Sequence, residues 1–177
     1  MKKLDIVPFE GIGILKLGDK REETDFKIKV LLKEAGINEE SLMVSRDYIA
    51  EGGYTRYFAE NFFVLVNFDP SDRAVEIGID KETRASFDVR LFDMDIFKTP
   101  AFEAVDALKA RSPLICDLPD EDLSYDYEFP EIGVRLWRDG VFHPKLLKDE
   151  SYMEEMKLTL EDEKEFLYFN IATVKIR

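Results

Sequence analysis

Three β-strand patterns in succession, joined by tight turns, constrain the fold of this 177-residue chain more than any other feature. Residues 54–58 and 62–68 are rich in aromatic and β-branched side chains, and only three residues separate them. Residues 74–79 form the third pattern, after an Asp-Pro-Ser-Asp turn. Connections this short join antiparallel neighbours, so the sequence predicts a β-meander.

A helical pattern precedes the meander at residues 19–35. Asp19 and Glu22 have the spacing of a capping box, in which a side-chain oxygen accepts a hydrogen bond from the first helical turn. Gly36 suits the left-handed residue that ends a helix. The apolar residues in between recur at i, i+3, i+4 and i+7, which predicts a buried helix face made of Ile28, Leu31, Leu32 and Ala35.

The order of a helix followed by a hairpin recurs further along the chain. Thr99 as a cap and Pro100 at the first helical position predict a second helix, which runs to about Arg111. Residues 124–129 and 133–138 predict the second hairpin. This echo suggests two structural halves, residues 9–80 and 87–140, joined in one sheet, and the sequence leaves open whether that sheet is continuous.

The C-terminal third is less regular. Ser151 and Glu154 again have capping-box spacing, which predicts a short helix, and residues 166–176 predict a closing strand. No linker rich in glycine and serine divides the sequence. We therefore expect a single domain over residues 1–177, of the α+β class, in which helices pack against an antiparallel sheet.

Charge narrows the classes of partner. The chain carries 25 Lys and Arg residues against 38 Asp and Glu residues, for a formal net charge of −13. This charge repels phosphate backbones and anionic membranes, so we expect a basic protein as the partner, with no nucleic acid and no membrane. Cys116 is the only cysteine, which excludes an intrachain disulfide, and acidic residues interrupt any signal peptide after Met1. The expected compartment is the cytoplasm.

Motifs for catalysis and for cofactors are weak. His143 is the only histidine and has no nucleophile motif beside it, and the glycines of residues 11–18 lack the spacing of a dinucleotide-binding loop. The acidic pair Asp93 and Asp95 and the acidic run 120–122 offer oxygen ligands for Mg²⁺ or Ca²⁺, but neither has the pattern of a calcium-binding loop. We therefore predict no catalytic residue, no metal site and no cofactor.

Acidic residues gather in two stretches. Residues 149–165 hold eight acids against Lys157 and Lys164 only. Residues 117–131 hold seven acids and no basic residue, and this stretch also carries tyrosines, with a tryptophan on the opposite strand of its hairpin. Aromatic anchors inside an acidic rim are typical of a surface that binds a basic protein. The predicted partner-binding residues are Asp117, Asp120, Glu121, Asp122, Tyr125, Asp126, Tyr127, Glu128 and Trp137.

Two segments resemble known families. The run Gly-Ile-Gly-Ile-Leu-Lys-Leu-Gly at residues 11–18, followed by Arg-Glu-Glu at 21–23, resembles the helix-then-meander unit of BamE-like proteins, although Asp19 replaces their methionine. The segment Tyr-Glu-Phe-Pro-Glu-Ile-Gly-Val at 127–134, with Trp137, resembles small bacterial immunity proteins that pair with toxins of contact-dependent growth inhibition.

The second resemblance implies a small, acidic, non-catalytic cytoplasmic protein that neutralises a basic toxin domain, such as a nuclease. Charge and the weak catalytic motifs favour the same interpretation. Two alternatives stay open: a scaffold or assembly module with an unknown ligand, and a metal-dependent hydrolase that uses Asp93, Asp95 or the acids near Asp120. The sequence leaves the oligomeric state open.

Overall fold

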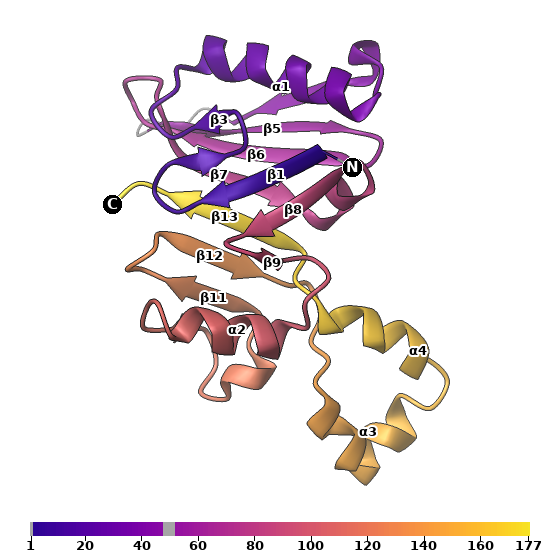
Figure 1. The fold of residues 1–177 in the computed structure, drawn as a ribbon. Helices are drawn as coiled ribbons and strands as arrows, with labels where there is room; N and C mark the ends of the chain where they lie inside the picture. Colours follow the sequence, from indigo (N-terminus) through magenta and orange to yellow (C-terminus); the bar gives the residue numbers. More distant parts are fainter. Residues whose placement is uncertain (1, 48–51) are drawn as a thin grey trace.

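The computed structural model describes residues 2–47 and 52–177, which form two packed layers (Figure 1). One layer is an eight-stranded sheet. The other layer has a five-stranded sheet at its centre, with helix α1 (Arg21–Ala35) at one end and helix α2 (Ala101–Lys109) at the other. The fold is α+β with two mostly antiparallel sheets, as predicted.

The eight-stranded sheet has the spatial order β10-β11-β12-β13-β7-β6-β5-β4, and every neighbouring pair is antiparallel. Strands β5, β6 and β7 confirm the predicted meander, and β11 and β12 confirm the second hairpin with shorter strands. The bounds are β4 Met43–Arg46, β5 Gly53–Ala59, β6 Phe62–Phe68, β7 Ala74–Asp80, β10 Ile115–Cys116, β11 Asp126–Phe129, β12 Val134–Trp137 and β13 Ile171–Lys175.

The five-stranded sheet has the order β3-β2-β1-β8-β9, and its central strands β1 and β8 are parallel. The apolar pattern Ile-Leu-Lys-Leu at residues 14–17 is typical of a strand, and two of its residues form β3. Strand β8, with the sequence Phe-Asp-Val-Arg-Leu, does alternate apolar and polar residues and was missed, whereas β2 and β9 have only two residues each. The bounds are β1 Lys2–Val7, β2 Gly11–Ile12, β3 Leu15–Lys16, β8 Phe87–Leu91 and β9 Met94–Asp95.

Helix α1 confirms its predicted buried face and its left-handed end at Gly36, whose φ is 74°. Its predicted capping box is wrong. The helix begins at Arg21, and the Asp19 carboxylate accepts hydrogen bonds from the Lys16 amide and the Lys27 ammonium, both at 2.8 Å. Asp19 therefore ties the helix to β3 instead of capping it.

Two more predicted caps are wrong. Pro100, not Thr99, is the residue before helix α2, and no side chain caps that helix, which ends at Lys109. Helix α3 (Glu150–Glu155) is capped by Asp149, whose carboxylate accepts from the amides of Ser151 and Tyr152. Spacing alone does not reveal which nearby acceptor reaches the free amides, because several acceptors compete at each helix start.

The two halves repeat their order of elements. Strands β1 to β3, helix α1 and strands β4 to β7 are followed by β8, β9, α2 and β10 to β13. The last strands of the halves, β7 and β13, pair at the centre of the large sheet. Even the turns after β1 and β8 correspond, because Phe9 and Phe92 both have positive φ angles, of 60° and 54°. The hairpins of both halves thus lie in one sheet.

The halves differ most in the connection before their last strand. In the first half a short turn at residues 69–73 joins β6 to β7, whereas residues 138–170 join β12 to β13. We call residues 138–170 the helical arm. It contains α3, the short helix α4 (Leu160–Glu163) and the 3₁₀ helices η4 (Pro144–Lys148) and η5 (Lys164–Leu167), and its two α-helices project from the sheets (Figure 1).

The predicted closing strand at residues 166–176 is correct only in its second part. Helix η5 occupies the beginning of that range, and Phe169 and Asn170 lead into β13 as buried residues. The strand runs through the core: Ala172 and Val174 are fully buried, and Val174 lies between Val134 and Ile77 on the neighbouring strands. This short strand therefore joins the halves in the large sheet, as the parallel pairing of β1 with β8 joins them in the five-stranded sheet.

We predict that Val174→Ala lowers the free energy of unfolding by about 2 kcal/mol, because it removes buried methyl groups and leaves a cavity between the halves. Ile176→Ala is the matched control, since Ile176 is two residues away and 48% exposed. Urea denaturation of both variants measures the difference. Equal losses in the two variants would contradict the role assigned to β13.

Candidate protein interface

The eight-stranded sheet has an outer face, on the side opposite the helices and the five-stranded sheet. Side chains on this face are partly exposed, while those of the opposite face are buried, as the alternating burial of β5, β6 and β12 shows. Among the described residues, the second layer of the fold covers only the inner face (Figure 1). The outer face is thus an open, broad surface.

A hollow of about 310 Å³ lies near the centre of the outer face. Its floor is set by the strand register, which places Gly78 between Leu65 and Thr173 on the adjacent strands. Gly78 has no side chain, so this position leaves a depression where its neighbours project. The residues that line the hollow are Tyr54, Arg56, Leu65, Glu76, Arg135, Trp137, Ile171 and Thr173.

The lining has the composition of a protein-binding hot spot. Trp137 is 37% exposed, and it lies beside Ile171 on the adjacent strand. Tyr54 lies across the hollow, two strands beyond Gly78, and Leu65 is between them. Tryptophan, tyrosine and arginine are the residue types most enriched among side chains whose truncation weakens protein complexes.

Charged side chains around the hollow are mostly paired. The Arg135 guanidinium makes two hydrogen bonds to Asp126, one at 2.8 Å, and this contact raises the pKa of Arg135. Arg56 pairs with Asp47. Glu76 differs, because among the described residues it forms no ion pair within 4 Å: its carboxylate accepts a hydrogen bond from the Tyr54 hydroxyl at 3.3 Å and interacts at longer range with Arg135.

The predicted acidic stretch at 117–131 is not the open acidic rim that was expected. Lys145, from the helical arm, lies 2.7 Å from Asp120 and 2.8 Å from Asp122, and it lowers the pKa of Asp122. Glu121 pairs with Lys109 at the end of α2. The sequence stretch contains no basic residue, but the fold brings basic residues to it from elsewhere.

Asp117 and Glu128 of this stretch are also engaged. The Asp117 carboxylate accepts hydrogen bonds from the amides of Tyr125 and Asp126, at 3.0 and 3.1 Å. Glu128 pairs with Lys175 on the outer face. Tyr125 is 42% exposed but lies outside the lining of the hollow. Of the predicted partner-binding residues, only Trp137 lines the hollow, with Asp126 and Glu128 at its margin.

The prediction that Tyr127 binds a partner is wrong, because its side chain is only 1% exposed and cannot contact a partner. Its hydroxyl donates toward the carbonyl oxygens of Glu121 and Ser124, at 2.7 and 2.8 Å, and accepts from Arg138 at 2.6 Å. Arg138 is itself 2% exposed and donates to the Ser124 carbonyl. This buried pair fixes the acidic loop against the base of the helical arm.

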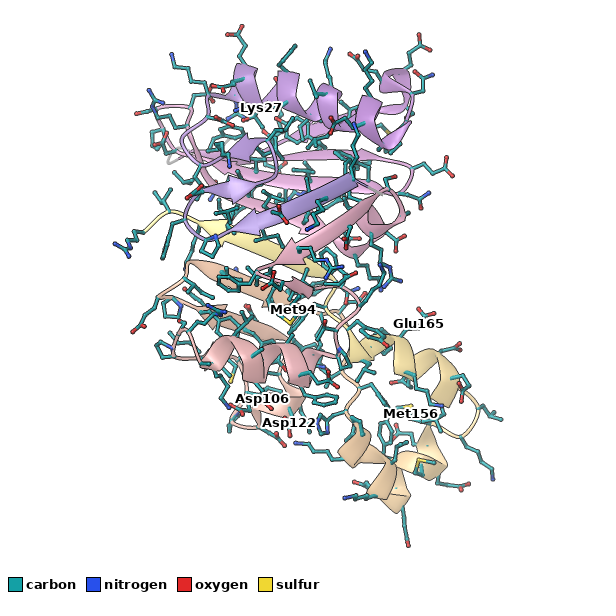
Figure 2. The ribbon with its side chains drawn as sticks, viewed as in Figure 1. Lys27, Met94, Asp106, Asp122, Met156 and Glu165 are labelled. Atoms are coloured by element: carbon teal, nitrogen blue, oxygen red, sulfur yellow. The ribbon has the colours of Figure 1, made fainter. Side chains whose placement is uncertain are left out.

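The second acidic stretch, residues 149–165, forms most of the helical arm. Among the described residues, its ion pairs join neighbours only: Lys157 with Glu154 at 3.8 Å and Lys164 with Glu161 at 2.6 Å. Leu158, between the two helices, is 96% exposed. Figure 2 shows Met156 and Glu165 on this projecting arm, while Asp122 lies on the body below α2. The arm therefore holds the less compensated acidic charge.

Sequence reasoning missed most of the hollow. Tyr54, Arg56 and Leu65 are the outward-facing residues of strands that were predicted, so the alternation within those strands was the available signal. Glu76 and Thr173 meet there only because β7 and β13 are neighbours. That pairing joins residues almost one hundred positions apart, and no local pattern reports it.

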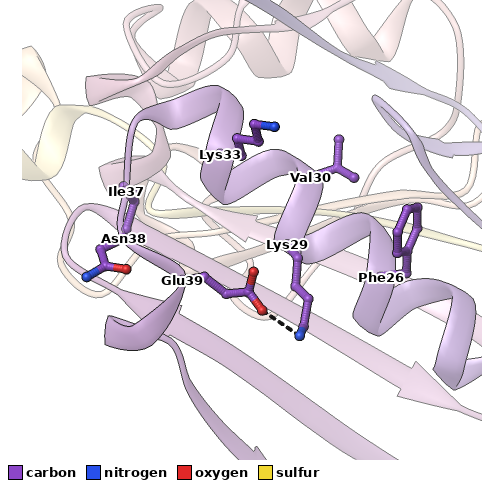
Figure 3. Close-up of a pocket in the computed structure, with 7 residues that line it drawn as sticks. All are labelled: Phe26, Lys29, Val30, Lys33, Ile37, Asn38 and Glu39. Carbon is purple, nitrogen blue, oxygen red and sulfur yellow. Dashed lines mark ion pairs between the residues drawn. The ribbon is translucent and has the colours of Figure 1, made fainter.

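A second concave surface lies on the exposed side of α1 (Figure 3). Phe26, 67% exposed, and Val30 line it together with Ile37, and Lys29 pairs across it with Glu39. It is far from the helical arm and shares no residue with the hollow. Substitutions on this surface can therefore serve as controls for substitutions on the outer face.

His143 and Asp95, which the sequence offers for catalysis or metal binding, have structural contacts in the fold. His143 packs edge-on against Phe102, with ring centroids 5.0 Å apart, and lies 3.8 Å from Asp122. Asp95 pairs with Lys98. Within residues 2–47 and 52–177, no group of three or more His, Cys, Asp or Glu side chains is placed to hold a metal ion. In the same ranges, no helix combines the length and apolar character that a membrane span requires.

Comparison of the chain with protein-family models, curated proteins and solved structures found no match.

We predict that Tyr127→Phe lowers the free energy of unfolding by about 1–3 kcal/mol, because buried Arg138 loses its hydroxyl acceptor. Tyr125→Phe is the matched control, since Tyr125 lies two residues away and is exposed. Chemical denaturation near neutral pH measures both. A Tyr127→Phe protein as stable as the control would contradict the buried pair.

We also predict that the stability difference between the wild type and Tyr127→Phe depends on pH. Burial raises the pKa of Tyr127 to about 12, above the value of about 10 for an unfolded tyrosine. The folded state therefore keeps the proton longer, so the contribution of Tyr127 is complete below about pH 10 and is lost as the pH rises towards about 12. The stability difference between the wild type and Tyr127→Phe should shrink over that range. A constant difference would show that Tyr127 titrates normally.

Proposed function

We propose that this chain is a non-catalytic protein that binds and inhibits a basic protein partner, in the manner of an immunity protein that neutralises a toxin. The observation that carries the proposal is the open outer face, whose hollow is lined by Trp137, Tyr54 and paired arginines. Exposed aromatic and arginine side chains around a depression are what a tight protein interface uses at its centre.

The breadth of the outer face supports this proposal. The register aligns one row of outward residues across six strands, from Glu128 on β11 to Arg56 on β5. Strands lie about 4.8 Å apart, so this row spans about 24 Å. A surface of that breadth suits an interface of ordinary size, which buries about 800 Å² on each partner.

The helical arm supports the choice of a basic partner. It leaves the sheet directly after Trp137 and returns directly before Ile171, so both of its ends meet the sheet at residues that line the hollow. Surface charge of this kind accelerates the encounter with an oppositely charged protein, while the buried centre of the interface supplies affinity. For a nuclease toxin, the arm carboxylates would occupy the place of substrate phosphates, and the chain would inhibit by occlusion.

We predict that Trp137→Ala weakens binding of the partner about 30-fold, the loss typical of a hot-spot residue. The partner is first captured from a lysate of the native host on the immobilised chain, and is then purified for titration. Phe26→Ala is the matched control, because Phe26 is an exposed aromatic residue on α1, outside the outer face.

Equal binding by the two variants would contradict the proposed interface, and so would a captured partner that is acidic. A concentration-dependent oligomer in light scattering, abolished by Trp137→Ala, would instead support the alternative of an assembly module that buries this face against a second copy.

Charge neutralisation can distinguish the contribution of the helical arm from that of the acidic residues 120–122. We predict that neutralising Glu154, Glu155 and Asp162 together slows association at low salt about tenfold, because exposed acids steer a basic partner. Neutralising Asp120, Glu121 and Asp122 should have a much smaller effect, since Lys109 and Lys145 already compensate them. Stopped-flow association rates measure both triple variants. A larger effect of the triple variant at Asp120, Glu121 and Asp122 would show that this loop, and not the helical arm, steers the partner.

A further inference from the structure

We propose that the hollow over Gly78 receives one basic side chain, a lysine or an arginine, from the protein partner. This inference rests on the proposed function and names the group that the outer face recognises. Three features carry it: the space above Gly78, the two aromatic residues around it, and the carboxylate of Glu76.

The space exists because glycine occupies the middle of a central strand. Gly78 faces Leu65 on one side and Thr173 on the other. A Cβ atom built on it would lie 3.0 Å from the Thr173 hydroxyl, so Thr173 already crowds this position, and any side chain here would reduce the hollow further. Glycine weakens a strand interior and often marks a place where another chain approaches closely. The hollow of about 310 Å³ above it has room for the long side chain of lysine or arginine.

The aromatic residues favour a cation. Trp137 and Tyr54 line opposite sides of the hollow, on β12 and β5, with Gly78 between them. The face of an aromatic ring carries partial negative charge and attracts ammonium and guanidinium groups, and tryptophan does so most strongly. The apolar stem of the incoming residue would contact Leu65 and Ile171, which complete the lining.

Glu76 supplies the charge. No basic side chain lies within 4 Å of its carboxylate among the residues that the structure describes, and its hydrogen bond comes from the Tyr54 hydroxyl. The two arginines at the rim are each held by a carboxylate, Arg135 by Asp126 and Arg56 by Asp47. Glu76 interacts with Arg135 only at longer range, so an incoming cation can form a direct ion pair with it, whereas an incoming carboxylate meets Glu76 and a chain of net charge −13.

The test uses Trp137 as the reporter, because it is the only tryptophan in the chain. Capped pentapeptides of the form Gly-Gly-X-Gly-Gly, with X as arginine, lysine, norleucine or glutamate, are titrated into the full-length ¹⁵N-labelled protein. The shift of the indole N–H resonance is followed. We expect saturable shifts with the arginine and lysine peptides, with dissociation constants on the order of millimolar for so small a ligand.

Two variants sharpen the titration. Glu76→Gln keeps the shape of the hollow and should weaken binding of the cationic peptides about tenfold, and Gly78→Ala should weaken it by filling the space. Glu39→Gln is the matched control, because Glu39 is a carboxylate paired with Lys29 on the surface of α1, outside the outer face. It should leave the affinity unchanged. Equal or larger shifts with norleucine or glutamate, or full affinity in Glu76→Gln, would overturn the inference.

The captured partner distinguishes this inference from the proposed function. If Trp137→Ala abolishes binding of the partner while Glu76→Gln binds it normally and the peptides cause no shift, the outer face is the interface and the cation site is overturned. If Trp137→Ala binds the partner normally, the proposed function fails, and the peptide titration still decides whether the hollow prefers a cation.

Discussion

The structure depends on one strand, β13, which pairs with β12 on one side and with β7 on the other. This pairing joins the two repeated halves into a single eight-stranded sheet, and it buries Ala172 and Val174 in the core. It also places Ile171 and Thr173 on the outer face beside Trp137 and Gly78. At the start of β13 the Asn170 amide donates to the Trp137 carbonyl at 2.8 Å, which closes the base of the helical arm. The fold and the candidate interface thus share one origin.

The sequence predicted the local elements well and their assembly poorly. Helix α1 and strands β5 to β7 follow strong periodicity and clear turns, so their positions were predictable. Strand β8 was missed although its apolar and polar residues alternate, and the hollow was missed because it depends on pairings between distant segments. Helix caps were also mispredicted, as Asp19 shows, because a carboxylate that could cap a helix was taken by a lysine from the next turns.

The position of the acidic surface was also mispredicted from the sequence, because charge pairing depends on the fold. Counting acids along the chain indicated residues 117–131 as the acidic surface, but Lys109, Lys145, Arg135 and Lys175 reach that stretch from other elements. The helical arm has far fewer such contacts, although its sequence looked similar. Because basic side chains pair with most acids of residues 117–131 in the folded chain, the uncompensated acidic charge lies mainly on the helical arm. The aromatic anchor remains Trp137, while Tyr127 belongs to the core.

The central claim is that the outer face around Trp137 contacts a basic protein. The most direct measurement is acrylamide quenching of Trp137 fluorescence, with and without the captured partner, because this single tryptophan is 37% exposed in the free chain. We predict that the bound partner shields the indole and lowers the quenching constant several-fold. An unchanged quenching constant in the saturated complex would place the partner elsewhere and contradict the account.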